Sequence, residues 1–188
     1  MRVMGIDPGL ATTGYGIIDL EGGEGSPRED SLKLVEAGVI TTPAEAPLPQ
    51  RLKMIHDEMH CLVGRFRPEE LIVEELFFAK NTKTAISVAQ ARGVVLLAAA
   101  DADLPVVGYT PLQVKLQLTG IGRATKQQIQ GMVARLLSLQ ELPKPDDAAD
   151  ALALALCHLL RRSSPAFRFR FQGEEQEGVQ LQRAHGRG

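Results

Sequence analysis

Acidic residues occur inside the most apolar segments of this chain, and this placement constrains the fold more than any other feature of the sequence. Asp150 lies one turn inside the alanine- and leucine-rich run at 148–156. Asp7 and Glu74 occupy comparable apolar surroundings earlier in the chain. Because an ionised carboxylate is strongly disfavoured away from water, a buried acid must be hydrogen-bonded, protonated, paired or bound to a cation. A metal ion shared by these acids is the simplest common partner.

Length and composition favour one globular domain. The chain has 188 residues, of which 44% are hydrophobic and 23% are charged, as is ordinary for soluble proteins. The longest apolar run, residues 94–100, is far shorter than the roughly 18 residues of a membrane span. No basic segment followed by an apolar one opens the chain, so we expect a cytoplasmic protein that does not contact a membrane. Cys61 and Cys157 are expected to be buried free thiols.

Hydrophobic periodicity predicts an α/β domain over residues 1–162 and a disordered tail over 163–188. Strands are expected at 2–7, 13–20, 32–41, 71–76 and 105–109, with the second and third forming a hairpin. Helices are expected at 50–66, 82–103, 111–118, 126–137 and from Asp146, as N-cap, to 162. Alternation along the fourth strand sends Glu74 and Glu75 to opposite faces of the sheet.

The helix expected at 82–103 becomes apolar around its whole circumference over residues 94–100. A helix of this kind is covered on all sides. In a chain of this size a second copy can supply one side, so we predict a homodimer. Burial between the sheet and another helix of the same chain is the alternative.

Charge is unevenly distributed along the chain. The net charge is −2 overall, whereas residues 76–135 hold seven Lys and Arg against two Asp. This stretch could bind a polyanion, or its charges could be scattered on solvated helices. Its basic residues are Lys80, Lys83, Arg92, Lys115, Arg123, Lys126 and Arg135.

The acids suggest metal-dependent phosphoryl chemistry. Oxygen-only ligands favour Mg²⁺ or Mn²⁺, and two such ions can act on a phosphodiester. Asp7, Glu74 and Asp150 would need one more acid from the same helix face, either Asp147 or Asp146. Each acid also has a structural interpretation, such as a turn, a helix-dipole contact or an ion pair with Arg.

A second pattern is less specific. His56 and His60 are four residues apart on a predicted helix, but the order of residues differs from the zinc-protease motif. A surface helix is the favoured interpretation. His158 and His185 have no identifiable partner in the sequence.

Several motifs follow one another in a recognisable order. They are Gly5-Ile6-Asp7-Pro8-Gly9 with Thr13-Gly14-Tyr15-Gly16, Phe77 through Asn81, Gln90-Ala91-Arg92-Gly93, Gln113-Val114-Lys115, Gly120-Ile121-Gly122 ahead of Lys126, and Asp147-Ala148-Ala149-Asp150-Ala151-Leu152-Ala153. Over about residues 1–162 the chain resembles RuvC-type Holliday junction resolvases. One departure is Ala89, where that family usually has Gly.

The resemblance implies an RNase H-like fold, with a mixed five-stranded sheet and helices on both faces, and a homodimer. It implies paired nicks in a four-way DNA junction that leave 5′-phosphate and 3′-hydroxyl ends. Position by position, it assigns Asp7, Glu74, Asp147 and Asp150 to metal binding, with two Mg²⁺ expected and Mn²⁺ as a substitute. Asp146 is then left as the helix cap.

The resemblance also assigns residues to DNA. Lys115 and Lys126 are expected beside the cleaved phosphate as part of the catalytic site, and Phe77 at the junction crossover. Lys80, Arg92 and Arg123 are expected to contact DNA, and a branch-migration helicase complex is a candidate partner. Two other functions compete: a non-catalytic junction-binding protein, and an actin-like ATP-dependent kinase or ATPase, for which the chain is short.

Overall fold

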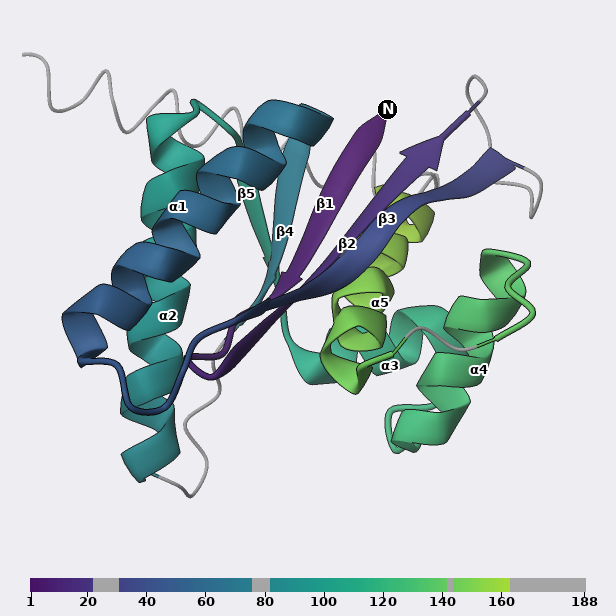
Figure 1. Ribbon diagram of the computed structural model, residues 1–188. Coiled ribbons are helices and arrows are strands. Elements are labelled where there is room, and N and C mark those ends of the chain that lie inside the picture. The colour runs from purple at the N-terminus through teal and green to yellow at the C-terminus, as the bar shows by residue number, and fades with distance from the viewer. Residues whose placement is uncertain (22–30, 76–81, 142–143, 163–188) are drawn as a thin grey trace, which may run out of the picture.

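The computed structural model describes residues 1–21, 31–75, 82–141 and 144–162, with only the backbone at 82–84. These residues form one five-stranded sheet and five helices (Figure 1). The strands are β1 (Arg2–Asp7), β2 (Thr12–Leu20), β3 (Leu32–Thr41), β4 (Glu70–Glu74) and β5 (Val106–Tyr109). The helices are α1 (Leu48–Phe66), α2 (Thr82–Asp101), α3 (Pro111–Thr119), α4 (Lys126–Leu136) and α5 (Asp146–Arg162).

The sheet is mixed, with strand order β3-β2-β1-β4-β5. β1, β2 and β3 form an antiparallel meander, so the predicted hairpin of the second and third strands is confirmed. β4 and β5 add to the other side of β1 as parallel strands. Because β1 and β4 run in the same direction, both reach their carboxyl ends at one edge of the sheet.

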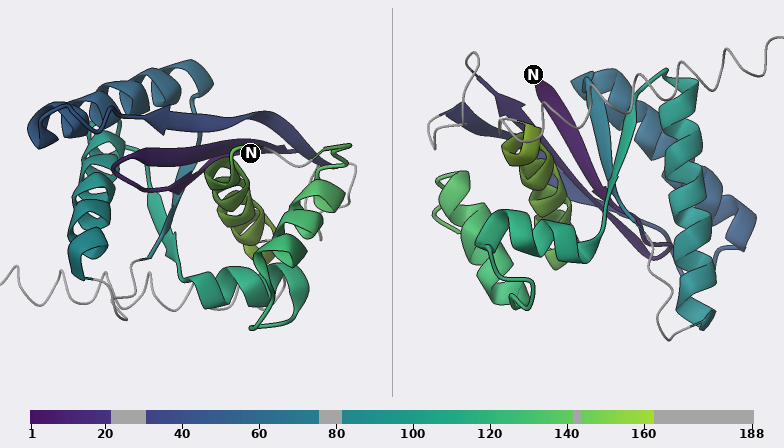
Figure 2. Two further views of the ribbon diagram at one scale, coloured as in Figure 1. Left: turned by 60° about the horizontal axis from the view of Figure 1, so that its bottom comes forward. Right: turned by 180° about the vertical axis from the view of Figure 1, so that it is seen from behind.

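Helices cover both faces of the sheet. α1 and α2 lie on one face, and α3, α4 and α5 lie on the other (Figures 1 and 2). Side chains alternate along β1, so that Val3 packs in the core beneath α5 while Met4 and Ile6 pack in the core beneath α1 and α2. The fold is therefore the predicted one, with two hydrophobic cores separated by the sheet.

Glycines bring α5 unusually close to the sheet. A methyl group at Gly5 would overlap with the carbonyl oxygen of Ala151, and one at Gly14 would overlap with the backbone of Asp147. A methyl group at Gly16 would meet the side chain of Leu152. The start of α5 therefore rests directly on the backbones of β1 and β2, at the end of the sheet where Asp7 lies.

Two sequence-based expectations are wrong. Cys157 is buried as predicted, but Cys61 is exposed because it lies on the outer face of α1. Asp146 is the first residue of α5 rather than the residue before it, and its carboxylate accepts a hydrogen bond from Gln130 Nε2 at 3.1 Å.

Partners for His158 are visible only in the structure. Its Nδ1 lies 3.0 Å from the hydroxyl of Tyr109, and its Nε2 lies 2.7 Å from a carboxylate oxygen of Glu70. The polar ring is thereby accommodated in the core, where it is 1% exposed. Among the described residues, no helix has both the length and the apolarity to cross a membrane.

Candidate active site

Two acids end neighbouring parallel strands. Asp7 is the last residue of β1, and Glu74 is the last residue of β4. Ile6 and Val73, the residues that precede the two acids, pair across β1 and β4. The side chains of Asp7 and Glu74 therefore extend from the sheet at the same level. Glu75 lies on the opposite side of β4 and packs over Gly108 of β5, which has no side chain to obstruct it. The prediction that Glu74 and Glu75 lie on opposite faces of the sheet is confirmed.

The other two acids come from the first turns of α5. Asp7 pairs with Gly14 across β1 and β2, and the backbone of Asp147 rests on Gly14. This close approach places Asp147 beside Asp7. Asp150, one turn further along α5, lines the same cavity as Asp7 and Glu74. The structure thus brings together the four acids that the resemblance assigns to metal binding.

Burial and the neighbouring negative charges raise the pKa of two of these acids, Asp7 and Glu74. Burial, followed by the negative charges of Glu74, Asp150 and Asp147, raises the pKa of Asp7 to about 7. Burial and the charge of Asp150 also raise the pKa of Glu74. A divalent cation would relieve this repulsion, and carboxylate oxygens are the ligands that hard cations prefer. The residues present therefore fit a Mg²⁺ or Mn²⁺ site.

A cavity of about 230 Å³ opens beside the acids. Since a water molecule takes up ~30 Å³, the cavity has room for cations with their waters or for a phosphate group. Its lining combines three carboxylates with two lysines, so the cavity suits a substrate that brings both a cation and an anionic group. Its lining consists of Asp7, Glu74, Pro111, Val114, Lys115, Lys126, Ile129, Asp150, Ala153 and Leu154.

Lys126 is held at the cavity by the start of α4. Thr125 caps this helix in a reciprocal capping box with Gln128, which fixes Lys126 as the first helical residue. The Lys126 ammonium lies 2.9 Å from Asp150 and 3.2 Å from Asp146. Hydrogen bonding to Asp150 raises the pKa of Lys126, so the side chain stays charged. Asp146, expected only to cap α5, therefore helps to orient Lys126.

Other predicted site residues are placed less centrally. Arg92 donates a hydrogen bond from Nε to the carbonyl oxygen of Glu74 at 3.0 Å, so it supports the end of β4 beside the acids. Arg123 is exposed in the turn before α4. Phe77 and Lys80 lie outside the described residues. The support that Arg92 gives to Glu74 was not anticipated, because the two residues are 18 positions apart in the sequence.

Comparison with known proteins agrees with this geometry. Residues 3–158 match the family model described as crossover junction endodeoxyribonuclease RuvC. The protein of that name from Syntrophomonas wolfei is 52% identical over 159 residues, which cover 85% of this chain and 88% of the relative. The one from Desulfitobacterium hafniense is 55% identical over 158 residues, which cover 84% of this chain and 92% of the relative.

Solved structures are also similar. Thermus thermophilus RuvC is 40% identical with a TM-score of 0.77, over 92% of this chain and 97% of that one. The same bacterium's RuvC in complex with a Holliday junction substrate is 39% identical with a TM-score of 0.78, over 87% of this chain and 95% of that one.

Fold and site together define a class: an RNase H-like protein with clustered acids at the ends of its central strands. Within that class, the match over residues 3–158 and the relatives at about half identity are decisive. The chain belongs to the RuvC family of crossover junction endodeoxyribonucleases.

Proposed function

We propose that this protein is a Mg²⁺-dependent endonuclease that resolves four-way DNA junctions in recombination and repair. The observation that carries the proposal is a cavity lined by Asp7, Glu74 and Asp150, with Asp147 close enough to Asp7 for its charge to raise the pKa of that carboxyl. The relative from T. thermophilus at 39% identity, in complex with a Holliday junction, supports the choice of substrate.

The four acids would hold two Mg²⁺ ions, and Mn²⁺ would substitute for them. Bound ions of this kind activate the attacking water and stabilise the departing oxygen of a phosphodiester, here leaving 5′-phosphate and 3′-hydroxyl ends. Asp7 and Glu74 would hold the ions from the ends of adjacent parallel strands. Asp147 and Asp150 close the site from α5.

The two lysines of the cavity would serve the DNA backbone. Lys115 lines the cavity from α3 and suits a contact with the scissile phosphate. Lys126 is held by Asp150 and Asp146 at a position from which it can turn to the same phosphate. Both lysines would stabilise negative charge that develops during cleavage.

A homodimer would present two such sites to the two strands of a symmetric junction. α2 supports this proposal, because one of its faces is apolar and exposed within the single chain: Ile86 is 63% and Leu97 is 54% exposed. Gly93 and Ala100 are exposed on the same helical face. A second copy can cover this stripe.

Further features complete the proposal. Arg123 is exposed in the turn that leads to Lys126 and is suited to a phosphate contact. We also propose DNA contacts for Phe77, Lys80 and Arg92. Arg92 would make this contact in addition to its hydrogen bond with the carbonyl oxygen of Glu74. We further propose a cytoplasmic location and a branch-migration helicase complex as the partner that delivers the junction.

Cleavage of a synthetic four-way junction tests the proposal. We expect symmetric nicks with Mg²⁺ or Mn²⁺ and none with EDTA. Glu74→Gln should reduce cleavage by more than about 100-fold, while junction binding remains. Glu75→Gln is the matched control, since Glu75 faces the other side of β4, and it should cleave normally. Binding without cleavage by the wild-type protein would indicate a non-catalytic junction-binding protein instead.

A further inference from the structure

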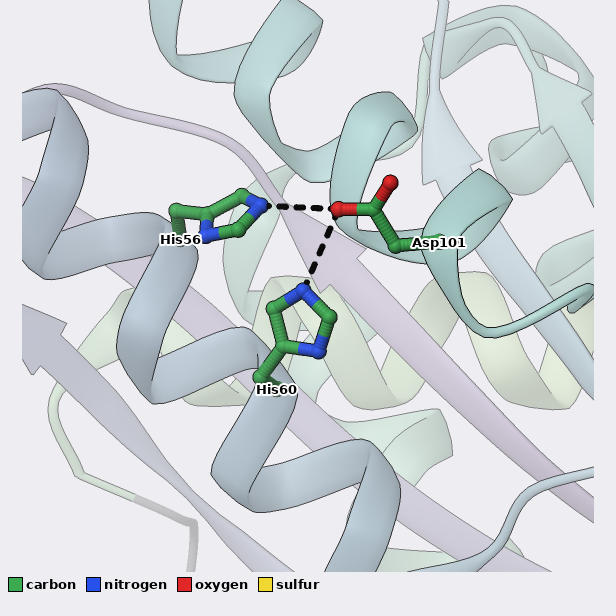
Figure 3. A group of neighbouring side chains, drawn as sticks. All are labelled: His56, His60 and Asp101. Carbon is green, nitrogen blue, oxygen red and sulfur yellow. Dashed lines mark hydrogen bonds and ion pairs between the residues drawn. The ribbon is translucent and has the colours of Figure 1, made fainter.

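A second group of metal-ligating side chains lies away from the acidic cavity. His56 and His60 project from adjacent turns of α1, and Asp101 is the last residue of α2 (Figure 3). The cluster lies between the two helices that cover the face of the sheet opposite α5 (Figure 1). Nothing in the proposed nuclease chemistry uses these residues.

Both imidazoles are directed at one carboxylate oxygen. Oδ2 of Asp101 lies 3.0 Å from Nε2 of His56 and 3.2 Å from Nε2 of His60. The three ligand atoms all lie within 4.8 Å of one another. Ligand atoms at 2.0–2.1 Å from a tetrahedral Zn²⁺ are about 3.3 Å apart, so the observed spacing needs only small side-chain adjustments to admit an ion.

We propose that His56, His60 and Asp101 bind one Zn²⁺ or a similar borderline divalent ion. Two imidazoles and one carboxylate suit Zn²⁺, Co²⁺ or Ni²⁺ better than Mg²⁺, which prefers oxygen ligands alone. This donor set differs from the all-carboxylate set of the cavity. The two proposed sites therefore favour different metal ions.

The surroundings support a cation here. His60 is 41% and Asp101 is 43% exposed at the side chain, so a fourth coordination position is open to water. Asp57 lies on the Nδ1 side of His56, 3.9 Å away, although its carboxylate is paired with Lys53 at 2.6 Å. Without an ion, hydrogen bonds from the imidazoles to Asp101 connect the helices. An ion replaces them with coordinate bonds.

The proposed ion is a structural clamp between α1 and α2. The helices already pack against each other through Met59, Val95 and Ala98 in the core beneath them. An ion that binds only the folded arrangement stabilises it in proportion to ligand concentration. The clamp is independent of junction cleavage, and its test does not depend on nuclease activity.

Co²⁺ absorption provides the first test. The full-length protein carrying Asp7→Asn and Asp150→Asn is used, so that the acidic cavity is weakened as a competing site. Four-coordinate Co²⁺ with nitrogen ligands absorbs visible light far more strongly than octahedral Co²⁺ with oxygen ligands. We expect one equivalent of Co²⁺ to give a strong band, which Zn²⁺ removes and which His56→Ala or Asp101→Asn abolishes. Glu58→Gln, an exposed acid on the same helix, is the control and should retain the band.

Thermal unfolding provides the second test. With Zn²⁺ at about 100 times its Kd, Tm should rise by roughly 5–10 °C, and Asp101→Asn should remove this rise while leaving the metal-free Tm within a few degrees. Asp101 and His60 are exposed and His56 is only partly buried, so these variants should fold. A Co²⁺ band that is absent, or a Tm rise that survives in Asp101→Asn, would overturn the proposal.

Discussion

At the scale of single residues, Asp7 shows how far the site depends on a cation. Burial and three neighbouring acids bring its pKa to about 7, so near neutral pH the metal-free protein holds this carboxyl only partly ionised. Lys126 opposes the shift but does not cancel it. The folded chain therefore keeps four acids together at a loss in stability, a feature expected of a binding site rather than of a structural network.

Metal-free stability should fall as pH rises. The pKa of Asp7 is raised in the folded state, so its contribution is fully present below the unfolded value of 3.8 and is lost as pH passes through about 7. In EDTA, the free energy of unfolding of the wild-type protein should fall by on the order of 2–4 kcal/mol between pH 4 and pH 8 because of Asp7. Asp7→Asn should remove this fall. Urea unfolding of both proteins across this range measures the difference. Parallel profiles would contradict the assignment.

A pair of adjacent acids gives a second prediction at this scale. Asp147 rests against Gly14 beside Asp7, whereas Asp146 contacts Lys126 and Gln130. Asp147→Asn should lower the cleavage rate by more than about 100-fold, and Asp146→Asn by less than about 10-fold. Single-turnover cleavage of the junction compares them directly. Equal losses would mean that the structure assigns the wrong acid to the metal.

At the scale of elements, the position of α5 depends on the glycines beneath it. Gly5, Gly14 and Gly16 allow the helix to contact the backbones of β1 and β2. This contact sets the distance between the acids of the helix and those of the strands. Packing at this helix-sheet interface therefore also determines how the four acids are arranged.

Gly14→Ala should disturb both stability and activity. Its methyl group has no room next to the backbone of Asp147, so α5 must shift, with a loss of about 1–3 kcal/mol in stability and a lower cleavage rate. Gly64→Ala on α1 is the control, since open space surrounds Gly64, and it should stabilise the protein by roughly 0.5–1 kcal/mol. Urea unfolding and junction cleavage measure the two effects. An unchanged Gly14→Ala protein would show that the close contact is not needed.

The elements themselves were largely predictable from sequence. The strand at Arg2–Asp7 and the helix at Lys126–Leu136 were placed within a residue, because apolar periodicity and capping residues are local signals. The four acids followed from their apolar surroundings and from motif order. Contacts between distant segments could not be found in this way: Asp101 meets His56 across 45 positions. The glycines beneath α5 were visible in the sequence, but only the helix above them explains their role.

At the scale of the whole molecule, the sheet separates the acidic cavity from an exposed apolar surface. The acids and lysines line a cavity between the ends of β1 and β4 and the helices α3, α4 and α5. These three helices lie together on one face of the sheet (Figure 2). On the other face of the sheet, α2 carries the exposed apolar stripe of Ile86 and Leu97. A dimer formed through that stripe would leave both acidic cavities accessible to DNA.

Leu97→Glu should prevent this association. A charge at the centre of the stripe would have to be buried without a partner, which strongly disfavours the dimer. Light scattering should report the mass of a dimer for the wild-type protein and of a monomer for Leu97→Glu. Leu112→Glu is the control, because Leu112 is similarly exposed, at 56%, but lies on α3. A wild-type monomer would contradict the proposed dimer.

Anomalous X-ray scattering from a crystal soaked in Mn²⁺ tests most directly whether the four acids form one cation site. We predict anomalous density within coordinate-bond distance of the carboxylates of Asp7, Glu74, Asp147 and Asp150, and none there in an Asp7→Asn crystal. Density that avoids these carboxylates, or that is unchanged in Asp7→Asn, would contradict the assignment.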